Sequence, residues 1–196
     1  MPVVGKRFRD ALVWAAELHE DQSRKGGNIP YVGHLLGVSA IVLEHGGNED
    51  QAIAALLHDA LEDQAHKMSA GEIRARFGDT VERIVEACTD GDPQEQLDRN
   101  KAKWRLRKEK YIAAIATKPP EAIIVSMADK LYNARSILED YRAIGDPVWS
   151  RFTTGREGTL WYYTALVDAF EAYGHDRLWG ELSRTVSELK NLVNAE

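Results

Sequence analysis

The segment from Ala54 to Asp63 places ionisable side chains within an apolar helical pattern. His58 and Asp59 directly follow a run of alanine and leucine, and Glu62 and Asp63 come about one helical turn later. Unpaired charges are costly to bury and shift each other's pKa values. A divalent cation resolves that conflict because it binds these groups in their deprotonated forms. The segment therefore predicts one short helix that carries a metal site and spare carboxylates on a single face, as in metal-activated hydrolases.

Composition and patterning restrict the class of protein. With 196 residues and 22.0 kDa, the chain fits one domain over residues 1–196 that can bury a sizeable core. The net charge of -6 argues against a general nucleic-acid-binding protein. The N-terminus becomes charged before an apolar signal region develops, and no apolar run approaches the ~20 residues of a membrane span. We therefore expect a cytoplasmic protein without a membrane or nucleic-acid partner.

Helical patterns account for almost the whole chain, and strand patterns are weak. The sequence therefore predicts a single all-α domain. The predicted helices include residues 8–20, 34–45, 101–117, 121–141, 158–173 and 177–194. Capping boxes are predicted for Asn48 with Gln51, Ser69 with Glu72, and Asp79 with Glu82.

Two further candidate metal ligands lie outside the first segment. His34 begins a predicted helix directly after residues 30–33. Asp129 lies in an otherwise apolar helix, where a buried carboxylate needs a partner. A metal ion is one such partner, and Lys130 or a nearby arginine is another. His19, on the first predicted helix, is expected to be structural and to orient the following loop by hydrogen bonds.

These candidate ligands, taken in chain order, resemble a known family signature. His34, the His58-Asp59 pair and Asp129 resemble the H…HD…D signature of the HD phosphohydrolase superfamily. The resemblance implies a single HD-domain helical bundle in which these four residues hold one divalent metal, usually Mn²⁺. A mixture of imidazole nitrogen and carboxylate oxygen suits that ion.

Three longer motifs narrow the resemblance to one branch of the superfamily. In order, they look like the hydrolase domain of the RelA/SpoT family in its stand-alone form, the small alarmone hydrolases. The core motifs lie within about residues 8–170, and the predicted C-terminal helix follows at 177–194. Residues 22–25 with 30–34 resemble the family's "Q-x-R-K…P-Y-x-x-H" segment, 58–63 its "H-D-x-x-E-D" motif, and 127–135 its "L-A-D-K-L-x-N-x-R" motif.

The resemblance also implies a reaction. Water activated by the metal would attack the 3′-linked pyrophosphate of (p)ppGpp, giving GDP or GTP and pyrophosphate. Glu62 and Asp63 would be the catalytic acidic pair that orients and deprotonates this water. The residues implied to contact the nucleotide are Arg24, Lys25, Asn133 and Arg135.

Other functions stay open from the sequence. The HD ligands alone also fit another nucleotide phosphatase, which would release orthophosphate instead of pyrophosphate. Ala134 stands where a larger apolar residue is common in the family, which would enlarge the base pocket, and residues 148–158 resemble the family only loosely. Adenosine alarmones are therefore an alternative to guanosine alarmones. An antitoxin-like hydrolase of adenosine alarmones, a non-catalytic partner of a toxin, and a homodimer are open as well.

Overall fold

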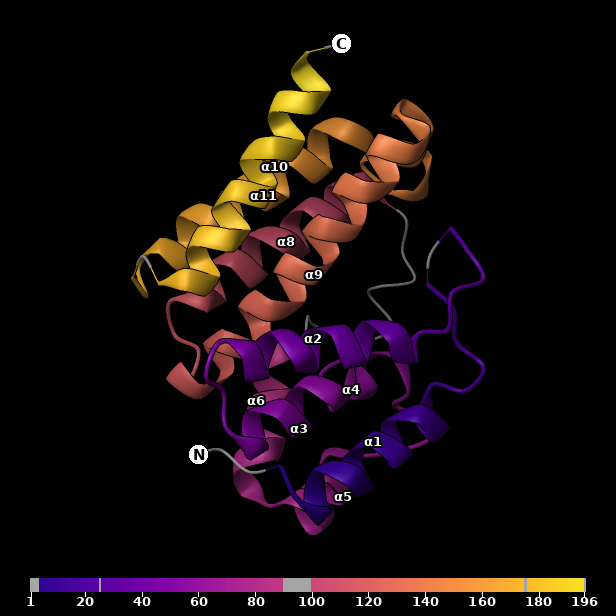
Figure 1. The fold of residues 1–196 in the computed structure, drawn as a ribbon, viewed down its shortest axis with the longest axis vertical. Helices are drawn as coiled ribbons and strands as arrows, with labels where there is room; N and C mark the ends of the chain where they lie inside the picture. The colour runs from indigo at the N-terminus through magenta and orange to yellow at the C-terminus, as the bar shows by residue number, and fades with distance from the viewer. Residues whose placement is uncertain (1–3, 25, 90–99, 175, 196) are drawn as a thin grey trace. The chain divides into compact units, whose positions relative to one another are not determined.

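The computed structural model describes residues 4–24, 26–89, 100–174 and 176–195, and most of them are helical (Figure 1). These described residues contain no β-strand, only an isolated bridge between Ser23 and Pro30. The predicted all-α fold class is therefore confirmed. The elements are α1 (Lys6–Leu18), α2 (Val32–Glu44), α3 (Glu49–Leu57), α4 (Ala60–Asp63), α5 (Ala70–Phe77), α6 (Asp79–Cys88), α8 (Lys101–Ile115), α9 (Pro120–Ile144), the 3-10 helix η1 (Asp146–Arg151), α10 (Gly155–Glu171) and α11 (Arg177–Asn194).

The chain divides into two compact units that share α9. The first unit consists of Met1–Pro93 and Lys118–Asp129, and the second of Gln94–Thr117 and Lys130–Glu196. Asp129 is thus the last residue that α9 contributes to the first unit. A single domain over residues 1–196 stays a prediction.

In the first unit, α3 is the central helix. Helices α1, α2 and α6 pack against it, and α5 packs against α6 (Figure 1). All residues from Ala52 to Leu57 are fully buried, with 0% exposure. A helix that is apolar on every side belongs in the interior of a protein. Because α3 ends at Leu57 in the interior, the next two residues, His58 and Asp59, begin directly at the core.

The pair itself lies at a junction between two helices, which corrects the prediction of one continuous helix. Helix α3 ends at Leu57 and α4 begins at Ala60, although His58 and Asp59 keep right-handed backbone angles. The His58 imidazole Nδ1 donates to the Ala55 carbonyl at 2.8 Å. In a continuous helix that carbonyl accepts from the amide of Asp59. Competition for this acceptor gives a physical reason for the break.

Two of the predicted capping boxes are confirmed. Asn48 accepts from the Gln51 amide at 3.0 Å, and the Gln51 side chain accepts from the Asn48 amide at 2.9 Å. Glu72 accepts from the Ser69 amide at 2.9 Å. Each box satisfies amide groups that the first helical turn leaves without an intrahelical acceptor.

The third predicted capping box, at Asp79, is wrong. Helix α6 begins at Asp79 itself, and its N-cap is Gly78, whose φ of +88° suits glycine. The Glu82 carboxylate instead accepts from the Arg74 guanidinium at 2.6 Å. That carboxylate is only 6% exposed, so the ion pair supplies the partner that a buried charge needs and joins α5 to α6.

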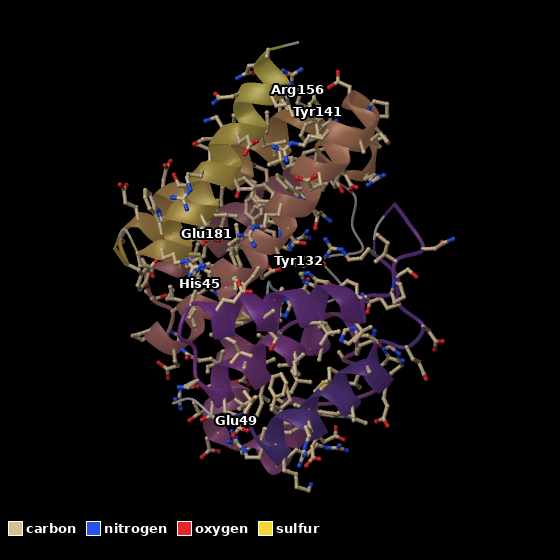
Figure 2. All side chains as sticks on the ribbon, in the orientation of Figure 1. His45, Glu49, Tyr132, Tyr141, Arg156 and Glu181 are labelled. Carbon is tan, nitrogen blue, oxygen red and sulfur yellow. The ribbon has the colours of Figure 1, made fainter. Side chains whose placement is uncertain are left out.

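The second unit is built around α10, which packs against α8, η1 and α11. Helix α11 spans the residues predicted, 177–194, and its Trp179 indole N–H donates to the Val167 carbonyl of α10 at 3.0 Å. Arg156 of α10, labelled in Figure 2, donates to the Val193 carbonyl near the end of α11 at 2.9 Å. Such a bond satisfies one of the last carbonyls of a helix. In the described part of the chain, no helix combines the length and apolar character that crossing a membrane requires.

Candidate metal centre

Three separate parts of the first unit supply the predicted ligands. His34 lies in the first turn of α2, His58 and Asp59 form the α3–α4 junction, and Asp129 lies in α9. Both histidines are almost completely buried, at 1% and 3% exposure, and Asp129 is 7% exposed. Residues from widely separated positions in the chain therefore meet in the interior of one unit.

The beginning of α9 is anchored before it reaches Asp129. The Gln51 side chain donates to the Glu121 carbonyl at 3.1 Å, and the Arg83 guanidinium donates to the Glu121 carboxylate at 2.7 Å. These bonds attach the first turn of α9 to α3 and α6. Because a helix is stiff over two turns, the anchor fixes where Asp129 lies relative to the end of α3.

The ligand atoms of the four residues converge. The Nε2 atoms of His34 and His58 lie 3.3 Å apart. Asp59 Oδ2 lies 3.0 Å from His58 Nε2 and 3.4 Å from His34 Nε2. Asp129 Oδ1 lies 3.3 Å from His34 Nε2 and 3.6 Å from His58 Nε2. Ligands held about 2.1 Å from a common cation lie roughly 3 Å from one another. The ligand atoms of His34, His58 and Asp59 all lie within 4.8 Å of one another, so these three residues fit one metal ion. Asp129 lies beside both imidazoles and is a candidate fourth ligand.

The protonation of His58 supports the same conclusion. Its Nδ1–H is occupied by the Ala55 carbonyl, which leaves Nε2 to face the cluster. Burial lowers the pKa of His58, but the carboxylates of Asp59 and Asp129 outweigh burial and raise it well above its ordinary value. The cluster thus attracts positive charge strongly. A divalent cation fits the same place once the imidazole has lost its proton.

Besides the two histidines, Asp59 has a hydrogen-bond partner that the sequence analysis did not identify. The Tyr31 hydroxyl donates to Asp59 Oδ2 at 2.6 Å. Burial raises the pKa of Asp59, but the imidazoles of His58 and His34 outweigh it and hold the pKa well below its ordinary value. The pKa of the Tyr31 phenol is raised by burial and by Asp59, so the phenol stays a hydrogen-bond donor. The position of Tyr31, three residues before His34, was the only sequence signal for this contact.

The candidate acidic pair lies directly beyond the junction. Glu62 and Asp63 are half-buried in α4, and their amides donate to the Asp59 carbonyl at 3.1 and 2.8 Å. The backbone therefore connects both acids to a candidate metal ligand. The Asp63 carboxylate also accepts a hydrogen bond from the side-chain Nε2 of Gln22 at 2.7 Å, a contact that sequence reasoning missed.

The candidate substrate residues are distributed differently. Arg24 is half-buried in the loop before α2, where its amide donates to the Ile29 carbonyl at 2.9 Å. Lys25 lies outside the described residues. Asn133 and Arg135 belong to the second unit, where Asn133 is half-buried and Arg135 is exposed. The Arg135 guanidinium donates to Glu181 of α11 at 2.5 Å, and Glu181 is labelled in Figure 2.

Comparisons of the sequence identify relatives. Residues 11–160 match the HD domain family. The chain is 39% identical to guanosine-3′,5′-bis(diphosphate) 3′-pyrophosphohydrolase MESH1 of Xenopus tropicalis over 131 residues. This stretch covers 65% of the present chain and 68% of the Xenopus protein. The human MESH1 protein is 36% identical over the same shares of the two chains.

Comparisons of the structure agree with those of the sequence. A solved structure described as a metazoan ortholog of SpoT that hydrolyses ppGpp matches with a TM-score of 0.77 and 26% identity, covering 96% of this chain and 98% of that one. The crystal structure of lmo0812 from Listeria monocytogenes matches with a TM-score of 0.65 and 30% identity, covering 82% of this chain and 99% of that one. The chain therefore belongs to the HD domain family and, within it, to the group that contains the MESH1 proteins.

Proposed function

We propose that this protein hydrolyses the 3′-pyrophosphate of (p)ppGpp, giving GDP or GTP and pyrophosphate. The observation that carries the proposal is the convergence of His34, His58, Asp59 and Asp129 in a chain that is 39% identical to a 3′-pyrophosphohydrolase of this nucleotide. The buried donor set is suited to binding one divalent cation, and the relatives indicate which bond is cleaved.

We assign the four converging residues as ligands of one Mn²⁺ ion. Two imidazole nitrogens and two carboxylate oxygens suit Mn²⁺, and four protein ligands leave coordination positions for water and substrate. A bound divalent cation would supply Lewis-acid activation of water and of a phosphoryl oxygen. The Tyr31 hydroxyl orients the Asp59 carboxylate by hydrogen bonding, as partners of metal ligands commonly do.

Glu62 and Asp63 are proposed to act on the attacking water. Carboxylates accept protons and orient water when they lie within hydrogen-bond reach of it. Both acids follow the candidate ligand Asp59 in α4, and their amides are bonded to its carbonyl. These backbone bonds hold α4 directly against the candidate ligand, which supports the proposal that the two acids act near the metal position. The proton taken from water would reach the leaving group or solvent through this pair.

Arg24, Lys25, Asn133 and Arg135 are proposed to bind the nucleotide. The chain as a whole carries a charge of -6, so a highly anionic substrate needs local cations. Arginine binds phosphate in a bidentate manner, and asparagine donates to phosphate or base. A cytoplasmic location, a homodimer and an association with a toxin stay predictions from the sequence.

The test is a product analysis with purified protein. We expect pyrophosphate from ppGpp in the presence of Mn²⁺, none with excess chelator, and a strongly reduced rate in the variant Glu62→Gln. Release of orthophosphate would contradict the proposal in favour of another HD-type nucleotide phosphatase. Turnover of an adenosine alarmone without turnover of ppGpp would contradict the choice of base while leaving the reaction type in place.

A further inference from the structure

A buried histidine lies beside the metal centre without being one of its candidate ligands. His19 follows the last residue of α1 and is 2% exposed. Its ring stacks on the ring of Tyr31, with centroids 5.2 Å apart and an interplanar angle of 18°. Its Nδ1 lies 2.6 Å from Gln22 Oε1. His19 was predicted to orient the following loop by hydrogen bonding, and Gln22 Oε1 is its partner in that loop.

The Gln22 amide is bonded on both sides, and this fixes its orientation. Gln22 Nε2 donates to the Asp63 carboxylate at 2.7 Å, and Gln22 Oε1 accepts from Gln64 Nε2 at 2.8 Å. An ionised carboxylate can only accept hydrogen bonds, so the amino group of Gln22 has to face Asp63. The carbonyl oxygen of Gln22 then has to face Gln64 and His19.

This orientation determines the tautomer of His19. Because Gln22 Oε1 is an acceptor, His19 must carry its proton on Nδ1. His19 Nε2 is buried and finds no hydrogen-bond partner among the described residues. Burial lowers the pKa of His19, in agreement with a neutral ring. The ring therefore acts as a fixed donor to Gln22.

The other donor to Gln22 is fixed as well. Gln64 is 7% exposed and directly follows Asp63 at the end of α4. Three residues later, the Lys67 ammonium donates to the Leu18 carbonyl at the end of α1 at 2.9 Å. The segment after α4 is thereby joined to the segment that carries His19 and Gln22. The hydrogen-bond network of His19, Gln22, Asp63 and Gln64 is therefore held at one end by the buried ring of His19 and at the other by the buried Gln64.

We propose that Gln22, held in orientation by His19 and Gln64, is a positioning residue that fixes the Asp63 carboxylate for its action on water. The proposal rests on the proposed function, because it assigns Asp63 a role in the hydrolysis. A carboxylate on a four-residue helix has rotational freedom about its side-chain bonds, and the bond from Gln22 selects one rotamer. Selecting that rotamer before substrate arrives lowers the cost of reaching the reactive geometry.

The main experiment separates kcat from KM in the variant Gln22→Ala. We expect kcat for ppGpp to fall roughly 10–100-fold, as is common when a partner of a functional side chain is removed. KM and the dissociation constant of Mn²⁺, measured by calorimetry, should each stay within about threefold, because Gln22 contacts neither substrate nor a candidate ligand in this account. The control is Glu72→Ala, which removes the capping box of α5 in the same unit, on a helix that carries no candidate ligand or catalytic residue. Its Tm should fall while kcat is retained.

Two variants at His19 test the origin of the effect. His19→Leu removes the donor to Gln22 and should lower kcat in the same direction as Gln22→Ala. His19→Asn should restore most of the activity, because the asparagine Nδ2 takes the position of the imidazole Nδ1 and donates likewise. In ¹⁵N spectra of the wild type, His19 should be protonated at Nδ1, and Gln22→Ala should weaken that tautomer preference.

The possible outcomes distinguish this proposal from the one on which it depends. If the wild type releases pyrophosphate but Gln22→Ala keeps its kcat, the positioning role is wrong and the function stands. If Gln22→Ala loses Mn²⁺ binding, or if His19→Asn is as impaired as His19→Leu, the network serves metal binding or packing instead. If the wild type hydrolyses no alarmone, both proposals are wrong.

Discussion

Two regions of this molecule concentrate charged side chains, and they do so under opposite conditions. In the first unit, Asp59 and Asp129 face two histidines that are 1% and 3% exposed. In the second unit, Arg142 pairs with Glu139 and Glu188, and all three side chains are between 43% and 69% exposed. Water solvates the second group, so each charge is stable alone. The buried group lacks that solvation and needs a cation.

The largest effect is expected when a buried carboxylate is removed. Asp129→Ala and Asp59→Ala should each lose metal binding and activity together, because each removes a negative charge and a ligand from the cluster. Calorimetric titration with Mn²⁺ and a pyrophosphate assay measure the two losses on the same preparation. The matched control is Asp79→Ala, since that carboxylate is 81% exposed. An Asp129→Ala protein that binds Mn²⁺ as tightly as the wild type would refute the assignment of this ligand.

A smaller effect is expected from an acid that is not a ligand. Glu62→Gln keeps the size of the side chain but removes the proton-accepting carboxylate. We expect Mn²⁺ to bind as in the wild type, while kcat falls by roughly a hundredfold or more. If the variant fails to bind Mn²⁺, the division between ligands and proton acceptors is wrong.

The stability of the metal-free protein and its affinity for Mn²⁺ should depend on pH in opposite ways. In the metal-free protein, the pKa of His58 is raised in the folded state, so its stabilising contribution is present below pH 6.5 and is lost as pH rises through the raised pKa. Mn²⁺ competes with that proton, so its affinity should increase with pH over the same range. Measurements of Tm from about pH 5.5 to about pH 8, with and without Mn²⁺, test both statements. An Mn²⁺ affinity that is independent of pH would contradict a protonated His58.

A change at a candidate substrate residue should spare the chemical step. Lys25→Ala removes one positive charge near the nucleotide in the proposed function. We expect KM for ppGpp to rise with little change in kcat, because the charge contributes equally to ground-state and transition-state binding. A loss confined to kcat would show that Lys25 acts on the transition state.

The smallest effect is expected in the exposed group. Glu188→Ala removes a partner of Arg142 at the surface of the second unit. Because both side chains are solvated and screened by salt, the free energy of unfolding should change by less than about 1 kcal/mol. Denaturant unfolding at low and high salt measures this change. A fall in the free energy of unfolding well above about 1 kcal/mol would contradict the view that these exposed charges are each stable alone.

The sequence predicted local structure well where the signals were local. The α11 bounds and the Asn48 and Ser69 capping boxes depend on residues within a few positions of each other, and they are confirmed. The prediction failed at Asp79, where glycine at the preceding position took the N-cap. It also failed at the α3–α4 junction, because the His58 side chain competes for a backbone acceptor that periodicity does not take into account.

The partners of the site were harder to predict. Tyr31 bonds to Asp59 across 28 positions of the sequence, and Gln22 bonds to Asp63 across 41. Helical periodicity assigns each residue to a face of its helix, but the packing of helices decides which distant side chain it meets. The candidate ligands could be named beforehand because burial of several charges has few chemical solutions, whereas an ordinary hydrogen bond has many.

The most direct test of the metal centre combines metal binding with catalysis. Metal-free protein is titrated with Mn²⁺ while pyrophosphate release from ppGpp is measured after each addition. We predict that activity rises in proportion to bound metal and reaches its maximum at one Mn²⁺ per chain. Activity that is unaffected by removing the metal, or a folded protein that binds no Mn²⁺, would contradict the claim that the buried charges form the centre of a metal-dependent hydrolase.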